Sequence, residues 1–460
     1  MLLQALVDRF ENQAPITVMV RASLENALSA ERLDAIFEKH AQRQTSRELM
    51  FSTVAEIMGL VAARIHPSPH AAFQARAEGI GVRVKALYDK LQRMEPNISR
   101  HLVADTAERM SQVVQSTGGT LPKLLPGYRV KILDGNHLRR TQRRIGKLRE
   151  LNAAPLPGHA LVVLDPETRL VVDVFPCEDG HAQERSVLPE VLETTQRNDL
   201  WIADRNFCTA DFLLGIKQRL GYFIIRQHSQ SPRYELAGKR TRIGRCETGM
   251  VYEQAAIIFH ADGRSARIRR ITVELDEPTR DKDREIHILT NLPKKAATAL
   301  RVADLYRRRW TIETAFAEVA QNLSGEIETL GYPKAALFSF CSALVAFNLF
   351  SVILAALRGA HGAEKIDEQV SVYYLADEVA HTQRGMMIAI ESDYWTRTYA
   401  TLPPDELARE LVRIATSVNL SRYRKHKRGP KKQVKPLNKK RRTHVSTARV
   451  LAQASVVSRC

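Results

Sequence analysis

The chain has 460 residues, 44% of them hydrophobic, which is long and apolar enough for roughly two to four globular domains. Its 69 lysine and arginine residues outnumber 51 aspartate and glutamate residues, and the formal net charge of +18 favours a polyanionic partner. The five cysteines are scattered and never form a C-x-x-C pair. Their pattern excludes a disulfide framework and a cysteine zinc site and indicates a reducing cytoplasm.

The N-terminal region, 1–125, is predicted to be helical, most clearly from residue 17 to about residue 116. Within it, Val82–Met94 and Ser99–Val114 are typical of two helices joined by a turn. Such a pair suits DNA-end binding, but most helical hairpins bind nothing, so both interpretations stay open. Glycines and prolines in 117–127 then predict a linker.

After the linker, strands alternate with helices. The predicted strands are Tyr128–Leu133, His159–Leu164, Leu170–Phe175, Leu200–Ala203 and Tyr222–Arg226, with helices at Arg185–Arg197 and Thr209–Leu220. Three strands, then helix, strand, helix, strand and a later helix is the order of the ribonuclease H-like α/β fold, whose mixed sheet opens with an antiparallel meander. We expect this core to comprise 126–226 and 293–335.

Three further regions complete the expected organisation. Residues 227–292 alternate in short segments and predict a β-rich insertion before the last core helix. Residues 336–420 are predicted to be a helical region suited to dimerisation. It begins within the apolar run Ala335–Leu357, which contains Asn348 and three serines and therefore predicts a buried core helix, with no membrane partner. The tail, 421–460, carries twelve basic residues from Arg422 to Arg442 and predicts a disordered arm that binds phosphates.

The segment Leu305–Leu323 reads L-Y-R-R-R-W-T-I-E-T-A-F-A-E-V-A-Q-N-L. Wound as one helix, it would place Tyr306, Arg309 and Glu313 within roughly 60° of one another, beside an apolar stripe. That arrangement would present a metal ligand and a phosphate contact together. The alternative is an ordinary amphipathic helix with a surface Arg–Glu pair.

Two aspartates, Asp134 and Asp204, each follow a predicted strand. In the ribonuclease H-like order these two strands are neighbours, so both side chains should emerge at one sheet edge, where Glu313 can pack across. Each aspartate alone also fits ordinary turn chemistry. Three converging carboxylates need a divalent cation, and Mg²⁺, as one or two ions, suits oxygen ligands and phosphodiester chemistry, with Mn²⁺ as a substitute.

The phrases I-L-D-G-N-H, I-A-D-R-N-F-C-T and Y-R-R-R-W-T-I-E resemble the catalytic regions of DDE insertion-sequence transposases. More narrowly, they resemble insertion-sequence family four, with its Tyr-x2-Arg-x3-Glu-x6-Lys signature. The resemblance runs from about residue 128 into the tail. It implies Asp134, Asp204 and Glu313 as catalytic metal ligands, and DNA contacts from Tyr306, Arg309 and the Arg205 of D-R-N-F.

Two departures from the family pattern stand out. The signature lysine is replaced by Ala320, and residues 227–292 contain no tryptophan to stack an extruded base. Either Tyr252 or Phe259 substitutes for it, or there is no flipped-base step. Near Asp134 the basic side chains form a cluster expected to follow donor DNA, although a solvated loop is the alternative. Its members are Arg139, Arg140, Arg143, Arg144, Lys147 and Arg149, and the first four are the predicted DNA contacts.

The resemblance implies a prokaryotic, cytoplasmic, nucleoid-associated transposase of the cut-and-paste type. It would bind double-stranded DNA at terminal inverted repeats, pair two ends as a homodimer, and join 3′-hydroxyls to target DNA. Two alternatives remain: a structure-selective Mg²⁺ nuclease on the same fold, and a catalytically silent DNA-binding regulator.

Overall fold

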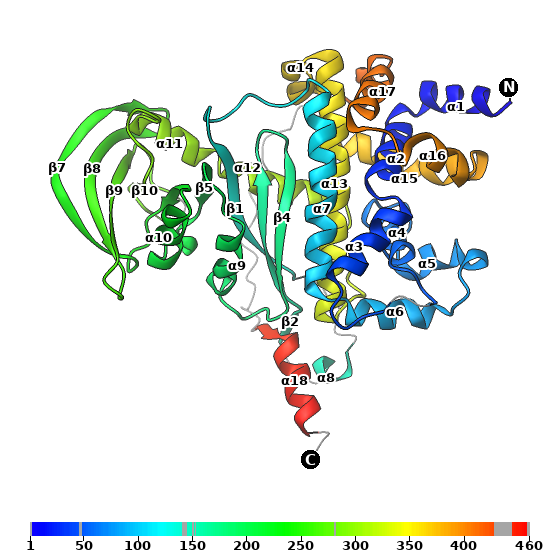
Figure 1. Cartoon of the computed structure of the whole chain (residues 1–460), viewed down its shortest axis with the longest axis horizontal. Helices are drawn as coiled ribbons and strands as arrows, with labels where there is room; N and C mark the ends of the chain where they lie inside the picture. Colours follow the sequence, from blue (N-terminus) through cyan, green and yellow to red (C-terminus); the bar gives the residue numbers. More distant parts are fainter. Residues whose placement is uncertain are drawn as a thin grey trace.

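A nine-stranded mixed sheet crosses the molecule in the order β4-β3-β1-β5-β6-β10-β9-β8-β7, as the computed structural model shows (Figure 1). The structure describes residues 2–45, 48–139, 145–149, 151, 153–279, 282–426 and 444–457. The strands of this sheet are β1 (Arg129–His137), β3 (His159–Asp165), β4 (Leu170–Cys177), β5 (Asp199–Ala203), β6 (Tyr222–Arg226), β7 (Arg233–Cys246), β8 (Gly249–Phe259), β9 (Ser265–Leu275) and β10 (Glu285–Thr290).

The first five strands of this sheet in chain order have the predicted ribonuclease H-like topology. Strand β3 pairs antiparallel with both β1 and β4, whereas β5 lies parallel between β1 and β6. The insertion is a β meander, as predicted. Its last strand, β10, pairs antiparallel with β6, so the insertion extends the core sheet and forms no second sheet of its own.

Alternate residues of the central strands enter two different cores, because successive strand side chains point to opposite faces. Ile132 and Ile202 pack with α7 (Pro96–Ser116), α12 (Trp310–Asn322) and α13 (Pro333–His361). Leu133 and Ala203 face the other way, toward the short helices of the opposite layer. These are α9 (Leu188–Glu193) and α10 (Ala210–Gln218).

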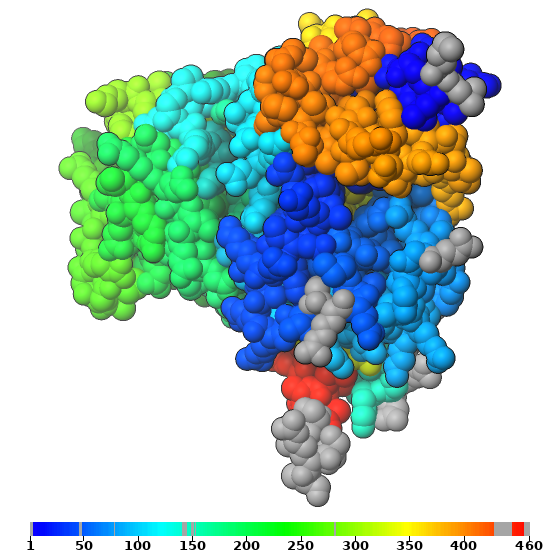
Figure 2. Space-filling view, turned by 45° about the vertical axis from the view of Figure 1, so that its right-hand side comes forward, coloured from blue at the N-terminus to red at the C-terminus, as the bar shows by residue number. Residues whose placement is uncertain are grey.

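The N-terminal and C-terminal helices form one body beside the sheet, and Figure 2 shows their surfaces side by side. Helix α2 packs against α15, α16 and α17, and α7 packs against α13 and α17. The remaining helices on this side are α1 (Leu2–Gln13), α2 (Pro15–Ala27), α3 (Ala30–His40), α4 (Phe51–Ala62), α5 (Pro69–Gln74), α6 (Val84–Arg93), α14 (Ala363–Gln369), α15 (Val372–Ala389), α16 (Ser392–Tyr399) and α17 (Pro404–Thr416). The predicted pair of helices before the linker exists as α6 and α7, and α7 is a core helix.

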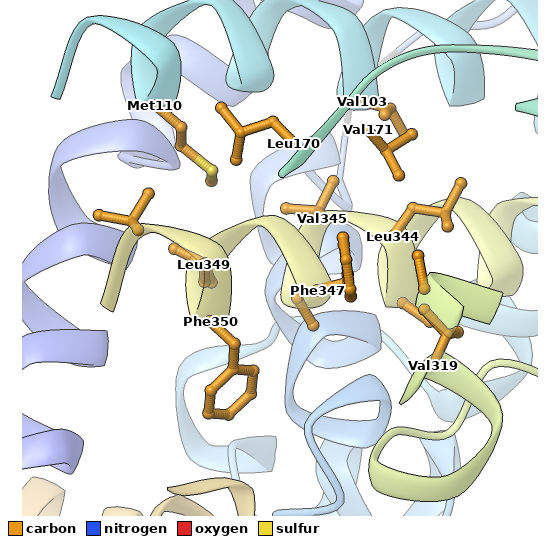
Figure 3. Packing of buried hydrophobic residues seen from close by; sticks show 14 of the residues in the cluster. Val103, Met110, Leu170, Val171, Val319, Leu344, Val345, Phe347, Leu349 and Phe350 are labelled. Carbon is orange, nitrogen blue, oxygen red and sulfur yellow. The ribbon is translucent and has the colours of Figure 1, made fainter. Parts of the chain in front are cut away.

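Helix α13 is the centre of the larger core. It is long and apolar enough to cross a membrane, but its most apolar window is wholly buried within the protein, as predicted for Ala335–Leu357. Asn348 bonds both the N–H and the C=O of Val171 in the edge strand β4 at 2.8 Å. Figure 3 shows side chains of α7, β4 and α12 gathered around α13, among them Val103, Met110, Leu170, Val171 and Val319.

Two predicted elements differ from the structure. Strand β1 continues past Leu133 to His137, because its antiparallel pairing with β3 outlasts its parallel pairing with β5. The helix predicted at Arg185–Arg197 is only a 3-10 turn, η2 (Glu184–Val187), followed by the six-residue α9. In the tail, residues 427–443 lie outside the described residues.

Beyond residue 443 the tail forms a strand and a helix, which differs from the largely disordered arm that the sequence predicts. Strand β11 (His444–Ser446) pairs parallel with β2 (Ala154–Leu156). Helix α18 (Thr447–Val457) packs on β11 and on α8 (Gly146–Arg149), at the lower end of the molecule in Figure 1. The backbone pairing and an ion pair between Arg449 Nε and Asp179 Oδ2 at 2.8 Å hold this segment against the core.

Candidate active site

The register of β1 and β5 brings the two predicted aspartates together. The last parallel pair is Leu133 with Ala203, so Asp134 and Asp204 follow it side by side on neighbouring strands. Asp134 lies within β1, not after it, and Asp204 begins the 3-10 turn η3 (Arg205–Phe207), where its Oδ1 accepts a hydrogen bond from Arg205 N at 2.6 Å. Both residues alternate onto the sheet face that α12 covers.

The single helix predicted over Leu305–Leu323 is broken into α11 (Ala299–Arg307) and α12. The break is tight: Arg309 N bonds Tyr306 O and Ile312 N bonds Arg309 O, both three residues apart. Arg309 keeps helical torsions, φ −50° and ψ −36°. A turn closed by i to i+3 bonds places residues three apart on the same side. Tyr306 and Arg309 therefore still face one way, with Glu313 in the first turn of α12.

Arg309 bridges two of the acids. Its Nη1 lies 2.9 Å from Asp134 Oδ2, and its Nη2 lies 2.8 Å from Glu313 Oε1. The arginine side chain is 9% exposed, against 19% for Asp134 and 45% for Glu313. Burial lowers the pKa of Arg309, but Tyr306 and the carboxylates of Asp134, Asp204 and Glu313 raise it more, so the guanidinium stays charged among them.

Tyr306 is buried at the same place. Burial, and then the nearby Asp204 carboxylate, raise the pKa of its phenol to about 12. The phenol therefore keeps its proton and can donate a hydrogen bond to an anion.

Asp134 is the most perturbed acid of the group. Burial raises its pKa to about 6, with further increases from Asp204 and Glu184, although Arg309 and the Gly135 N–H act in the opposite direction. Crowding of carboxylates beside one partly buried aspartate is typical of sites that hold a cation.

The family model described as the transposase DDE domain matches residues 125–349. This part of the chain is a transposase DDE domain. The match runs from the strand that carries Asp134 through α12 and into α13, so it includes all three predicted acids. No curated protein matches the chain. Membership of this domain family implies DNA binding and the use of a divalent metal.

The acids of the transposase domain are suitable ligands for such a metal, since all three offer carboxylate oxygens at one sheet edge. A different group of possible metal ligands lies in the helical body. Among the described residues, His40, His101 and Asp105 are the one trio whose donor atoms lie within 4.8 Å of one another. Its two imidazoles stack with centroids 3.4 Å apart and planes 6° from parallel, so their in-plane lone pairs cannot converge on one ion. The three acids of the transposase domain are not such a trio, and Arg309 stands between two of them, Asp134 and Glu313.

At the position of the missing signature lysine, the transposase domain meets the helical body. Ala320 and Asn136 line a cavity of about 160 Å³ together with Arg64. Arg64, with a left-handed φ of 59°, donates from Nη2 to Leu323 O at 3.0 Å. A cation therefore lies beside Ala320, but it comes from the loop after α4.

The predicted DNA-contact arginines are placed only in part. Arg139 is exposed, and its backbone N–H donates to Glu326 Oε2 at 2.5 Å. The Arg205 side chain is 42% exposed, and its Nη1 lies 4.0 Å from Asp283 Oδ2. Of the other members of the predicted cluster, Lys147 is exposed on α8, whereas Arg140, Arg143 and Arg144 lie outside the described residues.

The two aromatics predicted to replace the missing tryptophan contact arginines of the insertion: Arg240 lies over the Tyr252 ring and Arg233 over the Phe259 ring. An aromatic that was not predicted, Trp310, lies beside Arg309. Trp310 is 61% exposed, has the Arg309 guanidinium 5.7 Å from its ring centroid, and lines a cleft of about 1470 Å³ with Tyr306. The sequence signal for Trp310 is its position directly after Arg309 in Y-R-R-R-W, which lies outside the insertion 227–292.

Glu184 is a second residue that sequence reasoning missed. It lies in η2, and its carboxylate lies against Gly135, the residue after Asp134. A glutamate at the start of a short helix carries no distinctive spacing, so only the fold reveals this contact.

Proposed function

We propose that this chain is an insertion-sequence transposase of the cut-and-paste type, related to insertion-sequence family four. It would cut double-stranded DNA at terminal inverted repeats and join the 3′-hydroxyl ends to target DNA. The observation that carries the proposal is the pairing of Leu133 with Ala203, which sets Asp134 and Asp204 side by side within a transposase domain.

Asp134, Asp204 and Glu313 are proposed to hold Mg²⁺, as two ions, with Mn²⁺ able to replace it. Such ions activate the attacking oxygen and stabilise the leaving oxygen of an in-line phosphodiester displacement. The support is the donor set, three carboxylates around one sheet edge, and the raised pKa of Asp134.

Arg309 and Tyr306 are proposed to bind the phosphate that reacts. A planar guanidinium suits two-point contact with phosphate, and a phenol that keeps its proton can donate to a phosphate oxygen. Trp310 is proposed to stack on a base or sugar beside them, because its ring is open to the cleft.

The wider DNA surface is proposed to include Arg139, Arg205 and Arg64, together with the predicted cluster Arg140, Arg143 and Arg144. The basic tail would follow phosphates without reading sequence. The helical N-terminal region would bind the DNA ends, and two copies would pair them as a homodimer through residues 336–420. The proposed site of action is the prokaryotic cytoplasm, at the nucleoid, where the DNA substrate lies.

The test is cleavage of DNA that carries the inverted repeats flanking the coding region. With Mg²⁺ the protein should release or nick the end, and Asp204→Ala should abolish this. Cleavage that persists in Asp134→Ala and Glu313→Ala would overturn the assignment of the acids.

The same assay separates the two alternatives. A precleaved end with a free 3′-hydroxyl should be joined to target DNA by a transposase but not by a structure-selective nuclease. Footprinting of the ends with neither cleavage nor joining would identify a silent DNA-binding regulator.

A further inference from the structure

We propose that Glu184 is a fourth carboxylate of the metal centre, supplied from the opposite face of the sheet edge to Glu313. The inference rests on the proposed function, since it adds a ligand to the same Mg²⁺ site. Four observations carry it: its contacts with both aspartate motifs, its approach to Gly135, its lack of a permanent counter-charge, and the charge balance of the site.

Glu184 touches the residues that flank both aspartates. Its Oε1 lies 3.7 Å from His137 Nδ1, three residues after Asp134, and its Oε2 accepts a hydrogen bond from Asn206 Nδ2 at 3.3 Å, two residues after Asp204. The turn η2 packs on both β3 and η3, which fixes Glu184 between the two motifs.

Gly135 makes room for this carboxylate. A Cβ at position 135 would lie 2.1 Å from Glu184 Oε1 and 2.6 Å from its Cδ, a separation that real atoms cannot adopt. Gly135 is in the strand β1 and has no left-handed φ, so the glycine serves close approach rather than a turn. Successive residues of a strand face opposite ways, so Glu184 approaches the sheet edge from the face opposite to Arg309 and Glu313.

Glu184 has no arginine or lysine partner among the described residues. Its one ion pair there is with the imidazole of His137, whose Nδ1 lies 3.7 Å from Glu184 Oε1. The Glu184 side chain is only 16% exposed. A sheltered carboxylate that has no arginine or lysine beside it is a suitable oxygen ligand for a divalent cation.

The charge balance points to the same cation. With Glu184 included, four carboxylates surround the site, and the guanidinium of Arg309 pairs with two of them, Asp134 and Glu313. That leaves three negative charges uncompensated, which one or two divalent ions would offset.

The experiment compares Mn²⁺ binding by calorimetry to the full chain and to Glu184→Gln. Glutamine keeps the side-chain volume and an oxygen that accepts from Asn206, so only the charge is lost. Glu190→Gln, which changes an exposed glutamate on α9, is the matched control. We expect Glu184→Gln to weaken Mn²⁺ binding by about tenfold or more, and Glu190→Gln to leave it unchanged.

The outcomes separate this inference from the proposed function. Asp134→Asn weakening Mn²⁺ binding more than about tenfold, while Glu184→Gln stays within about twofold of the wild type, would overturn the role of Glu184 and leave the transposase assignment standing. Unchanged binding in both Asp134→Asn and Asp204→Asn would overturn the metal site itself.

A second variant protects the test against misfolding of the first. Gly135→Ala leaves Glu184 in the chain but places a methyl group where its carboxylate lies. It should weaken Mn²⁺ binding as Glu184→Gln does, and the two changes combined should cost little more than either alone, because both remove one interaction. Fully additive losses would show that Gly135→Ala weakens Mn²⁺ binding by a route other than Glu184, which would overturn the role given to Gly135.

Discussion

Arg309 Nη1 donates to Asp134 Oδ2 at 2.9 Å, across the space between α12 and the sheet edge. The same guanidinium reaches Glu313, so one positive charge is shared between two acids that face a common site. This pairing partly neutralises the carboxylates in the metal-free protein. A divalent ion that takes over the carboxylates would release Arg309 toward a DNA phosphate.

Replacement of Arg309 should show how far Asp134 depends on it. Arg309→Ala removes the cation that holds the pKa of Asp134 down, so that pKa should rise above about 6 and the carboxyl should be protonated near neutral pH. The free energy of unfolding should fall by about 1–3 kcal/mol. NMR titration measures the pKa of Asp134, and urea unfolding measures the free energy of unfolding. An unchanged pKa of Asp134 in Arg309→Ala would contradict the pairing.

The pH dependence of metal binding follows from Asp134. Its pKa of about 6 lies above the ordinary 3.8, so the folded, metal-free protein takes up this proton before the unfolded chain does. Acidification through that window therefore stabilises the fold at this group while it removes a ligand. The Mn²⁺ dissociation constant should rise about tenfold per pH unit below about 6. Asp134→Asn should flatten the profile, and a flat wild-type profile would exclude Asp134 as a ligand.

Arg64 should act as the cation that Ala320 does not supply. Arg64→Ala should weaken DNA binding equally across sequences and lower the slope of log K against log salt by about 1. Arg397→Ala, an exposed arginine on α16, is the control and should change neither. Ala320→Lys should steepen the slope. An unchanged slope in Arg64→Ala would assign Arg64 to the hydrogen bond with Leu323 alone.

Trp310 offers an internal optical reporter of DNA in the cleft. The other tryptophans, Trp201 and Trp395, are fully buried, so iodide should quench Trp310 selectively. End DNA should protect the indole from quenching, and Trp310→Ala should weaken binding by about 1–3 kcal/mol without loss of stability. Quenching that DNA does not alter would place the indole outside the complex.

Much of the core was predictable, because hydrophobic alternation and helical periodicity are local signals. The order of strands and helices alone implied that the strands ending near Asp134 and Asp204 are neighbours, and the register of β1 and β5 confirms this. The buried helix at Ala335–Leu357 followed from its composition in the same way.

The rest depends on contacts between residues distant in the chain. The break between α11 and α12 comes from i to i+3 bonds at Arg308–Arg309 that no residue type announces. Arg64 contacts the end of α12 because the loop after α4 packs there. Glu184 becomes a candidate ligand because its carboxylate lies against Gly135 at the sheet edge. Neither contact can be predicted from the spacing of residues in the sequence.

The most direct measurement is strand transfer from a precleaved end. Double-stranded DNA carrying the flanking inverted repeat, with a free 3′-hydroxyl, is incubated with target plasmid, Mg²⁺ and either wild-type protein or Asp204→Asn. The account predicts joined product from the wild type, and a loss of at least about a hundredfold in Asp204→Asn, which removes a proposed metal ligand from the site. Equal joining by both proteins would contradict it.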